Sequence, residues 1–262
     1  MSIAICVYVP EAIVLASDSR QMAQFERRPF FQGVAESPME EMKDAPLQRF
    51  VVTATDTAEK VFNFFDRAGV TAVGEHVLDG QPLSFEIRNC VYNECNAESS
   101  VQEIAEAIRK YFGEIHPSSH AQFLVAGFEE GGGTPFPEVY SVHVQRPDVV
   151  QVNFHEGRLR YGCLWMGEGD ILTTILASTE VQDGSGNLHK ISVPPVRFEG
   201  LTPMDARDFA RFAVNTTRTM QRFQARPKTV GGRTQCLVIS PDFMDWADKW
   251  DDTDDDDKDE DK

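Results

Sequence analysis

The sequence has no run of eighteen apolar residues, and its N-terminus has no basic segment followed by an apolar one. The first absence predicts that no helix spans a membrane, and the second argues against a secretory signal. The five cysteines are odd in number and scattered, which argues against a disulfide framework. The six histidines show no metal-ligand spacing. We therefore expect a cytoplasmic protein that needs no metal ion and no organic cofactor.

Positive charge is also scarce, since 25 Lys and Arg residues stand against 42 Asp and Glu, for a net charge of −17. Such a balance argues against nucleic acid or an anionic membrane surface as a partner. Part of the charge is local, because residues 251–262 contain nine acids and two lysines, a net charge of −7. This stretch cannot bury enough apolar area to offset chain entropy, so we predict a disordered acidic tail over 246–262.

Two apolar runs are present at the N-terminus, over residues 3–9 and 12–16, and a proline and a glutamate separate them. The pattern predicts a β-hairpin whose first strand begins directly after Ser2. Removal of Met1 would give Ser2 a free α-amine beside its hydroxyl. An α-amine has a pKa of about 7.7–8.0, which suits a general base. Ser2 could then supply both the nucleophile and the base of an acyl-transfer reaction.

Ser2, Asp18 and Arg20, spread across such a hairpin, resemble the start of a proteasome-type β-subunit, a family of N-terminal nucleophile hydrolases. Lys60 and, fourteen residues later, Gly74 match the spacing of the family's lysine and its oxyanion-binding glycine. The resemblance implies that Lys60 tunes the charge near the Ser2 nucleophile and that Asp18 holds Lys60. The Gly74 N–H would stabilise the oxyanion. Arg20 would either orient backbone around the site or form a structural salt bridge.

The lysine assignment has an alternative, because residues 21–57 form a longer connection than the family usually has. Its prolines and mixed composition predict an irregular loop insertion over about 21–50. Lys43 lies inside this acidic insertion. Lys60 is favoured over Lys43 because it opens an apolar run and keeps the spacing to Gly74.

Two positions depart from the family pattern. Glu168, within Gly167-Glu168-Gly169, stands where the family has a serine between two glycines, and Val230 precedes the closing glycine pair. No acid lies near Pro227, where the family places an aspartate. We predict that Glu168 hydrogen-bonds the α-amine in place of the missing serines. In these departures the sequence resembles two kinds of bacterial proteasome homologue, the ancestral-β-subunit group and the β-proteobacterial homologue.

Periodicity predicts the remaining elements. A serine cap and an apolar stripe predict a helix over 101–112, a threonine cap and a proline predict another over 203–224, and a third, shorter helix is expected at 170–177. Strands are predicted over residues 121–128, 138–144, 149–154, 158–166 and 234–240. This order indicates an α+β protein in which helices flank antiparallel sheets. The resemblance further implies a four-layer αββα sandwich, here one domain over 1–245.

The resemblance implies a hydrolase that cleaves peptide or amide bonds through an acyl-enzyme on Ser2. It also implies a ring or double ring of identical subunits, a peptide or unfolded-protein substrate, and an ATPase or adaptor as a further partner. Two alternatives remain open. One is a catalytically inactive ring-forming scaffold of the same fold, and the other is a small-molecule amidase that uses the same chemistry.

Overall fold

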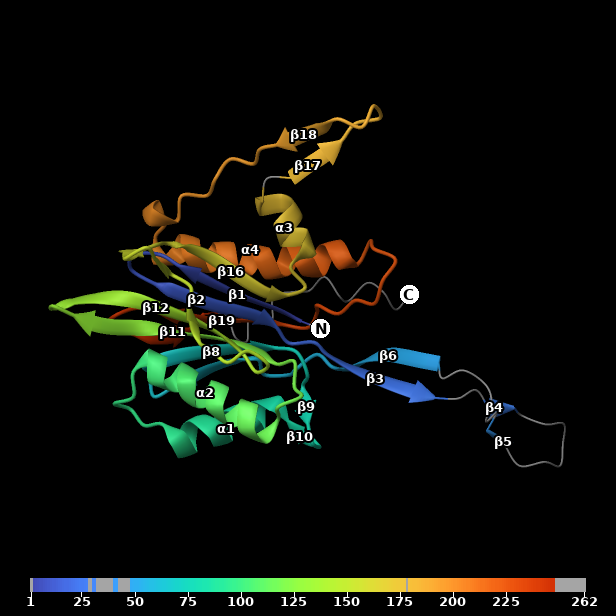
Figure 1. Cartoon of the computed structure of the whole chain (residues 1–262), viewed down its shortest axis with the longest axis horizontal. Coiled ribbons are helices and arrows are strands. Elements are labelled where there is room, and N and C mark those ends of the chain that lie inside the picture. The colour runs from blue at the N-terminus through green and yellow to red at the C-terminus, as the bar shows by residue number, and fades with distance from the viewer. Residues whose placement is uncertain (1, 28–29, 32–39, 42–47, 178, 248–262) are drawn as a thin grey trace.

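The computed structural model describes residues 2–27, 30–31, 40–41, 48–177 and 179–247 (Figure 1). Most of the predicted acidic tail and the alternative lysine, Lys43, lie outside the described residues. None of the described helices is long and apolar enough to cross a membrane.

The N-terminal hairpin lies in the middle of a five-stranded antiparallel sheet, as Figure 1 shows. Strand β1 (Ile3–Tyr8) pairs with β2 (Ile13–Asp18) on one side and with β16 (Gly162–Gly167) on the other. Strand β2 also pairs with β19 (Thr234–Ile239), which pairs with the edge strand β20 (Met244–Trp246). Every residue of β1 and β2 is buried, which explains why both strands are almost entirely apolar. The predicted hairpin is confirmed.

A second five-stranded antiparallel sheet contains the middle of the chain. Its strands, in spatial order, are β13 (Val150–Gln151), β12 (Thr134–His143), β11 (Gln122–Gly131), β8 (Ala68–Val73) and β7 (Val61–Phe64). A two-residue turn joins β11 to β12, and both turn residues, Gly132 and Gly133, have positive φ. This conformation suits a tight hairpin and explains the run of three glycines at this point.

Within the residues that the structure describes, four α-helices flank the two sheets. The capping residues predicted from the sequence begin α2 (Val101–Ile115) and α4 (Pro203–Gln221), because Ser100 and Thr202 each form a capping box. The short helix α3 (Asp170–Leu176) confirms the prediction at 170–177. Helix α1 (Leu83–Glu94) precedes α2, and a 3₁₀ turn, η1 (Phe198–Gly200), precedes α4.

Three apolar cores hold these elements together. Alternate β1 residues point to opposite faces, so Ile5 packs beneath α4, whereas Cys6 points to the second sheet. The core between the sheets includes Leu124 of β11, and the core on the far face of the second sheet includes Ile108 of α2. Figure 1 shows α3 and α4 on one side of the paired sheets and α1 and α2 on the other.

Two β-ribbons project from this body (Figure 1). Where the sequence predicted an irregular loop, β3 (Gln21–Arg27) pairs with β6 (Gln48–Thr55), and β4 (Phe30–Phe31) pairs with β5 (Glu40–Glu41). The second ribbon, formed by β17 (Thr179–Gln182) and β18 (Leu188–Ile191), was not predicted.

Short strand pairs make up the rest. The predicted strands over 149–154 and 158–166 are each divided by a turn, so that β14 (Phe154–His155) and β15 (Arg158–Leu159) form their own hairpin between β13 and β16. Strands β9 (Val77–Leu78) and β10 (Gln81–Pro82) form another small hairpin just before α1.

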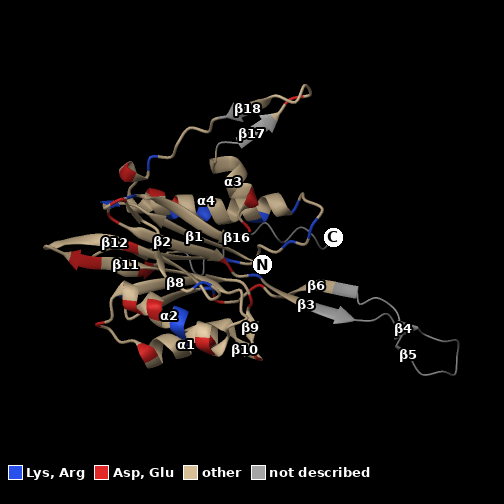
Figure 2. Cartoon of the chain, in the orientation of Figure 1, with Lys and Arg blue, Asp and Glu red and all other residues tan. Residues whose placement is uncertain are grey.

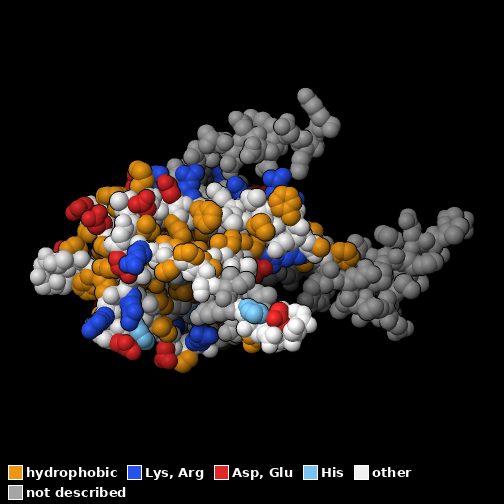
Figure 3. Space-filling view, turned by 90° about the horizontal axis from the view of Figure 1, so that it is seen from above, with side chains coloured by type: hydrophobic (Ala, Val, Ile, Leu, Met, Phe, Trp, Pro, Cys, Tyr) orange, Lys and Arg blue, Asp and Glu red, His pale blue; other side chains and the backbone are white. Residues whose placement is uncertain are grey.

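Charged and apolar side chains are intermixed on the outer surface. Acidic and basic residues lie on both helix layers (Figure 2), and apolar side chains lie among them on the face seen in Figure 3. Large side chains more than half exposed include Phe85, Tyr92, Ile115, Met204, Leu188 and Phe223.

Candidate active site

Ser2 lies at the start of β1, at the centre of the first sheet, and is fully buried. Its carbonyl oxygen accepts a hydrogen bond from the Glu168 N–H at 2.9 Å. Gly167, with φ of +81°, passes so close to this carbonyl that a β-carbon there would overlap the Ser2 oxygen. The Gly-Glu-Gly segment therefore fixes the position of Ser2 through its backbone.

Lys60 is the residue just before β7, and its side chain reaches Ser2. Its Nζ lies 2.8 Å from Ser2 Oγ, 3.0 Å from Asp18 Oδ1 and 2.5 Å from the Arg20 carbonyl oxygen. These three acceptors account for the three hydrogens of an ammonium group. The side chain is only 2% exposed, and the Gln235 amide oxygen of β19 accepts a bond from the Lys60 N–H. Lys60 is therefore held from both its backbone and its amino group.

Asp18 ends β2 and is buried beside Lys60. Its Oδ1 accepts hydrogen bonds from Lys60 Nζ and from the Ile3 N–H, and its Oδ2 accepts from the N–H groups of Arg20 and Gly231, each N–H at 3.1 Å. A buried carboxylate is costly unless its oxygens are hydrogen-bonded, and here both are. Through these bonds Asp18 links the start of β1 to Lys60 and to Gly231, which lies shortly before β19.

Burial lowers the pKa of Lys60, because the charged ammonium is removed from water, while Asp18 opposes this effect. The amino group is thus held beside Ser2 Oγ by a negative charge in a weakly solvated place. A cation there stabilises negative charge that develops on the serine oxygen.

Arg20 forms a structural ion pair, which was one of the two roles expected for it. Its Nε and Nη2 bind the two carboxylate oxygens of Asp56 at 2.6 and 2.8 Å, and its Nη1 donates to the Lys228 carbonyl. Gly231 lies against this guanidinium, where a β-carbon would overlap it. The Arg20 backbone reaches the site, since its carbonyl accepts from Lys60 Nζ and its N–H donates to Asp18.

Gly74 directly follows β8, with φ of +119°. A β-carbon there would lie 2.9 Å from the Ala121 Cα, so the position accepts only glycine without strain. Gly74 lies two residues before a histidine that contacts Ser2, which places its strand end beside the site. That its N–H binds an oxyanion stays a prediction.

Glu168 makes different contacts from those predicted. Its carboxylate accepts a bond from Arg226 Nη1 at 3.1 Å and a longer one, at 3.5 Å, from the Gln221 amide. Within the described residues these are its side-chain hydrogen bonds. The prediction that it holds the α-amine of Ser2 stays a prediction, and the ion pair to Arg226 competes with that role.

His76 completes the set around Ser2, and sequence reasoning missed it. Its Nε2 lies 3.1 Å from Ser2 Oγ. Burial, with the nearby Lys60 charge, lowers the pKa of His76 to about 3, so the imidazole is neutral at physiological pH. No spacing motif marks this residue, and its position two residues after Gly74 was the one signal that could have found it.

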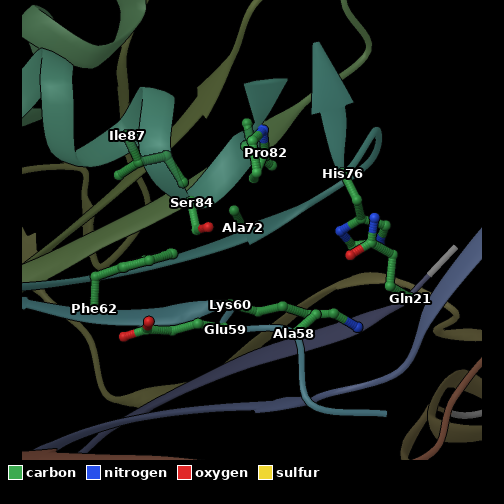
Figure 4. A pocket seen from close by; sticks show the side chains of 11 residues that line it. Gln21, Ala58, Glu59, Lys60, Phe62, Ala72, His76, Pro82, Ser84 and Ile87 are labelled. Atoms are coloured by element: carbon green, nitrogen blue, oxygen red, sulfur yellow. The ribbon is translucent and has the colours of Figure 1, made fainter. Parts of the chain in front are cut away.

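A small, partly open cavity of about 60 Å³ lies beside these groups. Figure 4 shows Lys60, Gln21 and His76 converging at one end. Phe62, Leu83 and Ile87 line the rest with small and polar neighbours. The described part of the chain contains no cluster of three or more acidic, His and Cys side chains that could hold a metal ion.

Comparison with known proteins gives a structural match and no sequence match. No protein-family model matches the sequence, and no curated protein resembles it significantly. A solved structure, a Gly-1 mutant of Anbu from Hyphomicrobium sp. strain MC1, matches with a TM-score of 0.53. The fold is similar to that of Anbu. The match covers 94% of this chain and 85% of the Anbu chain at 10% identity, a likeness that extends to the fold alone.

Proposed function

We propose that the chain is a proteasome-like N-terminal nucleophile hydrolase that cleaves peptide or amide bonds through an acyl-enzyme on Ser2. One observation carries the proposal: the Lys60 amino group lies 2.8 Å from Ser2 Oγ and is held there by the buried Asp18. The likeness to Anbu, a bacterial proteasome homologue of the kind the sequence resembles, supports the same conclusion at the level of the fold.

The reaction follows from these positions. After Met1 is removed, the free α-amine of Ser2 accepts the hydroxyl proton, directly or through a water molecule, as Oγ attacks the carbonyl carbon. The negative charge moves to the carbonyl oxygen, where the Gly74 N–H would donate to it. Collapse expels the amine, which takes the proton from the α-ammonium. Water then attacks the ester, the proton passes through the same amine, and Ser2 is regenerated.

The substrate would lie across the rim of the cavity, with one side chain inside it. Phe62, Leu83 and Ile87 favour an apolar group there, and Gln21 and His76 favour a polar contact close to the scissile bond. We further propose that the layers form the αββα sandwich of this family, and that identical subunits assemble into a ring with their sites facing an inner chamber. An ATPase or adaptor that feeds such a chamber stays a prediction.

Intact-protein mass spectrometry of the natively expressed chain, with and without a peptide β-lactone, tests the proposal. We expect loss of the Met1 mass and one covalent adduct, which the variant Ser2→Ala does not form. A retained Met1, or an adduct that persists in Ser2→Ala, contradicts the mechanism. Peptide and acyl-amide substrates tested side by side then separate a peptidase from a small-molecule amidase.

A second candidate is a catalytically inactive scaffold of the same fold. The observation that favours it is the Glu168–Arg226 ion pair, which occupies the carboxylate at the position where the family uses a serine near the α-amine. A scaffold would assemble and yet react with no electrophile at Ser2, so the same experiment separates the two candidates.

A further inference from the structure

We propose that His76 is a positioning residue for the nucleophile: its neutral imidazole accepts the hydroxyl hydrogen of Ser2 through Nε2 and so fixes the orientation of that hydroxyl. The inference rests on the proposed function, because it assigns a role in the reaction of the same site. It concerns a side chain for which the resemblance to known hydrolases gives no role.

The count of hydrogen-bond donors and acceptors leads to this assignment. Lys60 Nζ directs its three hydrogens to Ser2 Oγ, Asp18 Oδ1 and the Arg20 carbonyl, so Ser2 Oγ accepts from the ammonium. A hydroxyl has one hydrogen to donate. Within the described residues, the remaining group at hydrogen-bond distance from Ser2 Oγ is His76 Nε2, at 3.1 Å. The Ser2 hydrogen therefore points to His76, and the imidazole carries its own hydrogen on Nδ1.

A backbone hydrogen bond holds the main chain of His76 in place. The His76 carbonyl accepts a hydrogen bond from the Leu83 N–H at 2.8 Å, which ties the residue to the start of α1. Its side chain lies with those of Lys60 and Gln21 at one end of the cavity, as Figure 4 shows. Among the described residues, the charge that acts on it is that of Lys60, which is paired with Asp18. Since the nearest charge is positive, the neutral form of the imidazole is favoured.

A fixed hydroxyl changes what the oxygen can do. Of the two lone pairs on Ser2 Oγ, one accepts from Lys60, and the hydrogen is directed to His76. The second lone pair is then free to attack a carbonyl carbon at the rim of the cavity. As the new C–O bond forms, the hydrogen leaves its hydrogen bond to His76 Nε2 and passes to the α-amine, directly or through a water molecule, so His76 gains no proton and remains neutral. Loss of the acceptor should therefore slow the attack without changing which group is the base.

The test compares the rate of Ser2 acylation by a peptide β-lactone in wild type, His76→Gln and His76→Leu. A glutamine amide oxygen can reach the position of Nε2 and accept a hydrogen bond, but it does not act as a base. We expect His76→Leu to react about 10-fold more slowly and His76→Gln to recover most of the rate, with the pH profile of wild type. Thermal unfolding of each variant establishes that it is folded.

Two results overturn the inference. If His76→Gln is as slow as His76→Leu and the pH profile changes, His76 is a general base. If all three proteins react equally fast, the contact has no role in the attack. A wild type that does not react at all refutes the proposed function instead. In that case nitrogen-15 NMR decides the inference, which requires an Nδ1–H tautomer, no titration between pH 5 and 8, and an Nε2 shift that changes in Ser2→Ala.

Discussion

Lys60 and Asp18 form an ion pair that is buried almost completely, at 2% and 1% exposure. Burying two charges has a large desolvation cost, and such a pair rarely stabilises a fold more than apolar residues of similar size would. Its presence in the buried interior, where β2 ends and β7 begins, is thus better explained by chemistry than by stability. The pair places a cation beside Ser2 Oγ, where a chain selected for stability alone would place an apolar contact.

The first prediction concerns this pair. Lys60→Met removes the cation and leaves the Asp18 carboxylate buried without its charge partner, so we expect the free energy of unfolding to fall by roughly 3–5 kcal/mol. In the double variant Lys60→Met, Asp18→Asn no charge is left unpaired, and the loss should be smaller than the sum of the two single losses. Urea unfolding of the two single variants and the double variant measures these losses. Additive losses would mean that the two side chains are not energetically coupled.

A second prediction follows from the depressed pKa of His76. Its pKa is about 3 in the folded protein against the ordinary histidine value of 6.5, so below pH 6.5 the unfolded chain binds a proton that the folded chain does not. Stability contributed by this group is therefore present above pH 6.5 and is lost as the pH falls. Between pH 6.5 and 5.0 the loss should be about 1.6 kcal/mol.

The control for this pH dependence is His76→Gln, which has no titrating group at the position. Urea unfolding of both proteins at pH 6.5 and pH 5.0 gives the difference. Equal losses in the two proteins would show that carboxylates elsewhere, and not His76, cause the pH dependence.

At this scale the sequence predicted the groups that follow regular patterns. Ser2, Asp18 and Lys60 each adjoin an apolar strand, so their types and spacing were informative, and the structure brings all three into contact. His76 carries no such pattern, because its contact with Ser2 spans 74 residues and depends on how β8 ends against the first sheet. Glu168 was noticed for its position, but its pairing with Arg226 depends on a turn between α4 and β19.

Among the elements, the end of β16 at Gly167 leaves the least room for a side chain near the site. We predict that Gly167→Ala lowers the free energy of unfolding by roughly 2–4 kcal/mol and moves Ser2, because φ is +81° and the β-carbon would overlap the Ser2 carbonyl. Gly184→Ala is a matched control, since nothing lies within 4 Å of its β-carbon, and it should change stability by less than about 0.5 kcal/mol. Thermal unfolding compares the two, and similar losses would contradict the steric argument.

Element prediction succeeded where caps and apolar period agreed. Helices α2 and α4 begin at the capping residues that the sequence indicates. Helix α2 ends at Ile115, three residues beyond the predicted end at residue 112. Strands β3 and β6 could not be found in this way. They pair with each other outside the two main sheets, so they lack the continuous apolar pattern of a core strand, and the prolines between them suggested a loop.

For the whole molecule, the exposed apolar side chains predict association between copies. Tyr92, Met204 and Phe223 are more than half exposed, on the outer helices and just after α4, and the proposed ring would cover part of this apolar surface. A net charge of −17 on each chain opposes association, so salt should favour it. Analytical ultracentrifugation should give particles of many times 29.4 kDa, with larger ones at higher salt.

The variant Met204→Glu tests which surface is used, since a buried carboxylate on the outer face of α4 should release smaller particles. Phe85→Glu, on the other helix layer, is the comparison. A wild-type particle of 29.4 kDa at all salt concentrations would contradict both the prediction and the proposed ring.

The position of β1 has a consequence for how the protein is made. The strand that follows Ser2 is synthesised long before its partners, because β16 lies about 160 residues farther along the chain and β19, which completes β2, ends at Ile239. Pairing between such distant segments is slow and must wait for synthesis to reach them. Ser2 is fully buried in the finished fold. The removal of Met1 that the proposed function requires therefore has to precede closure of the fold.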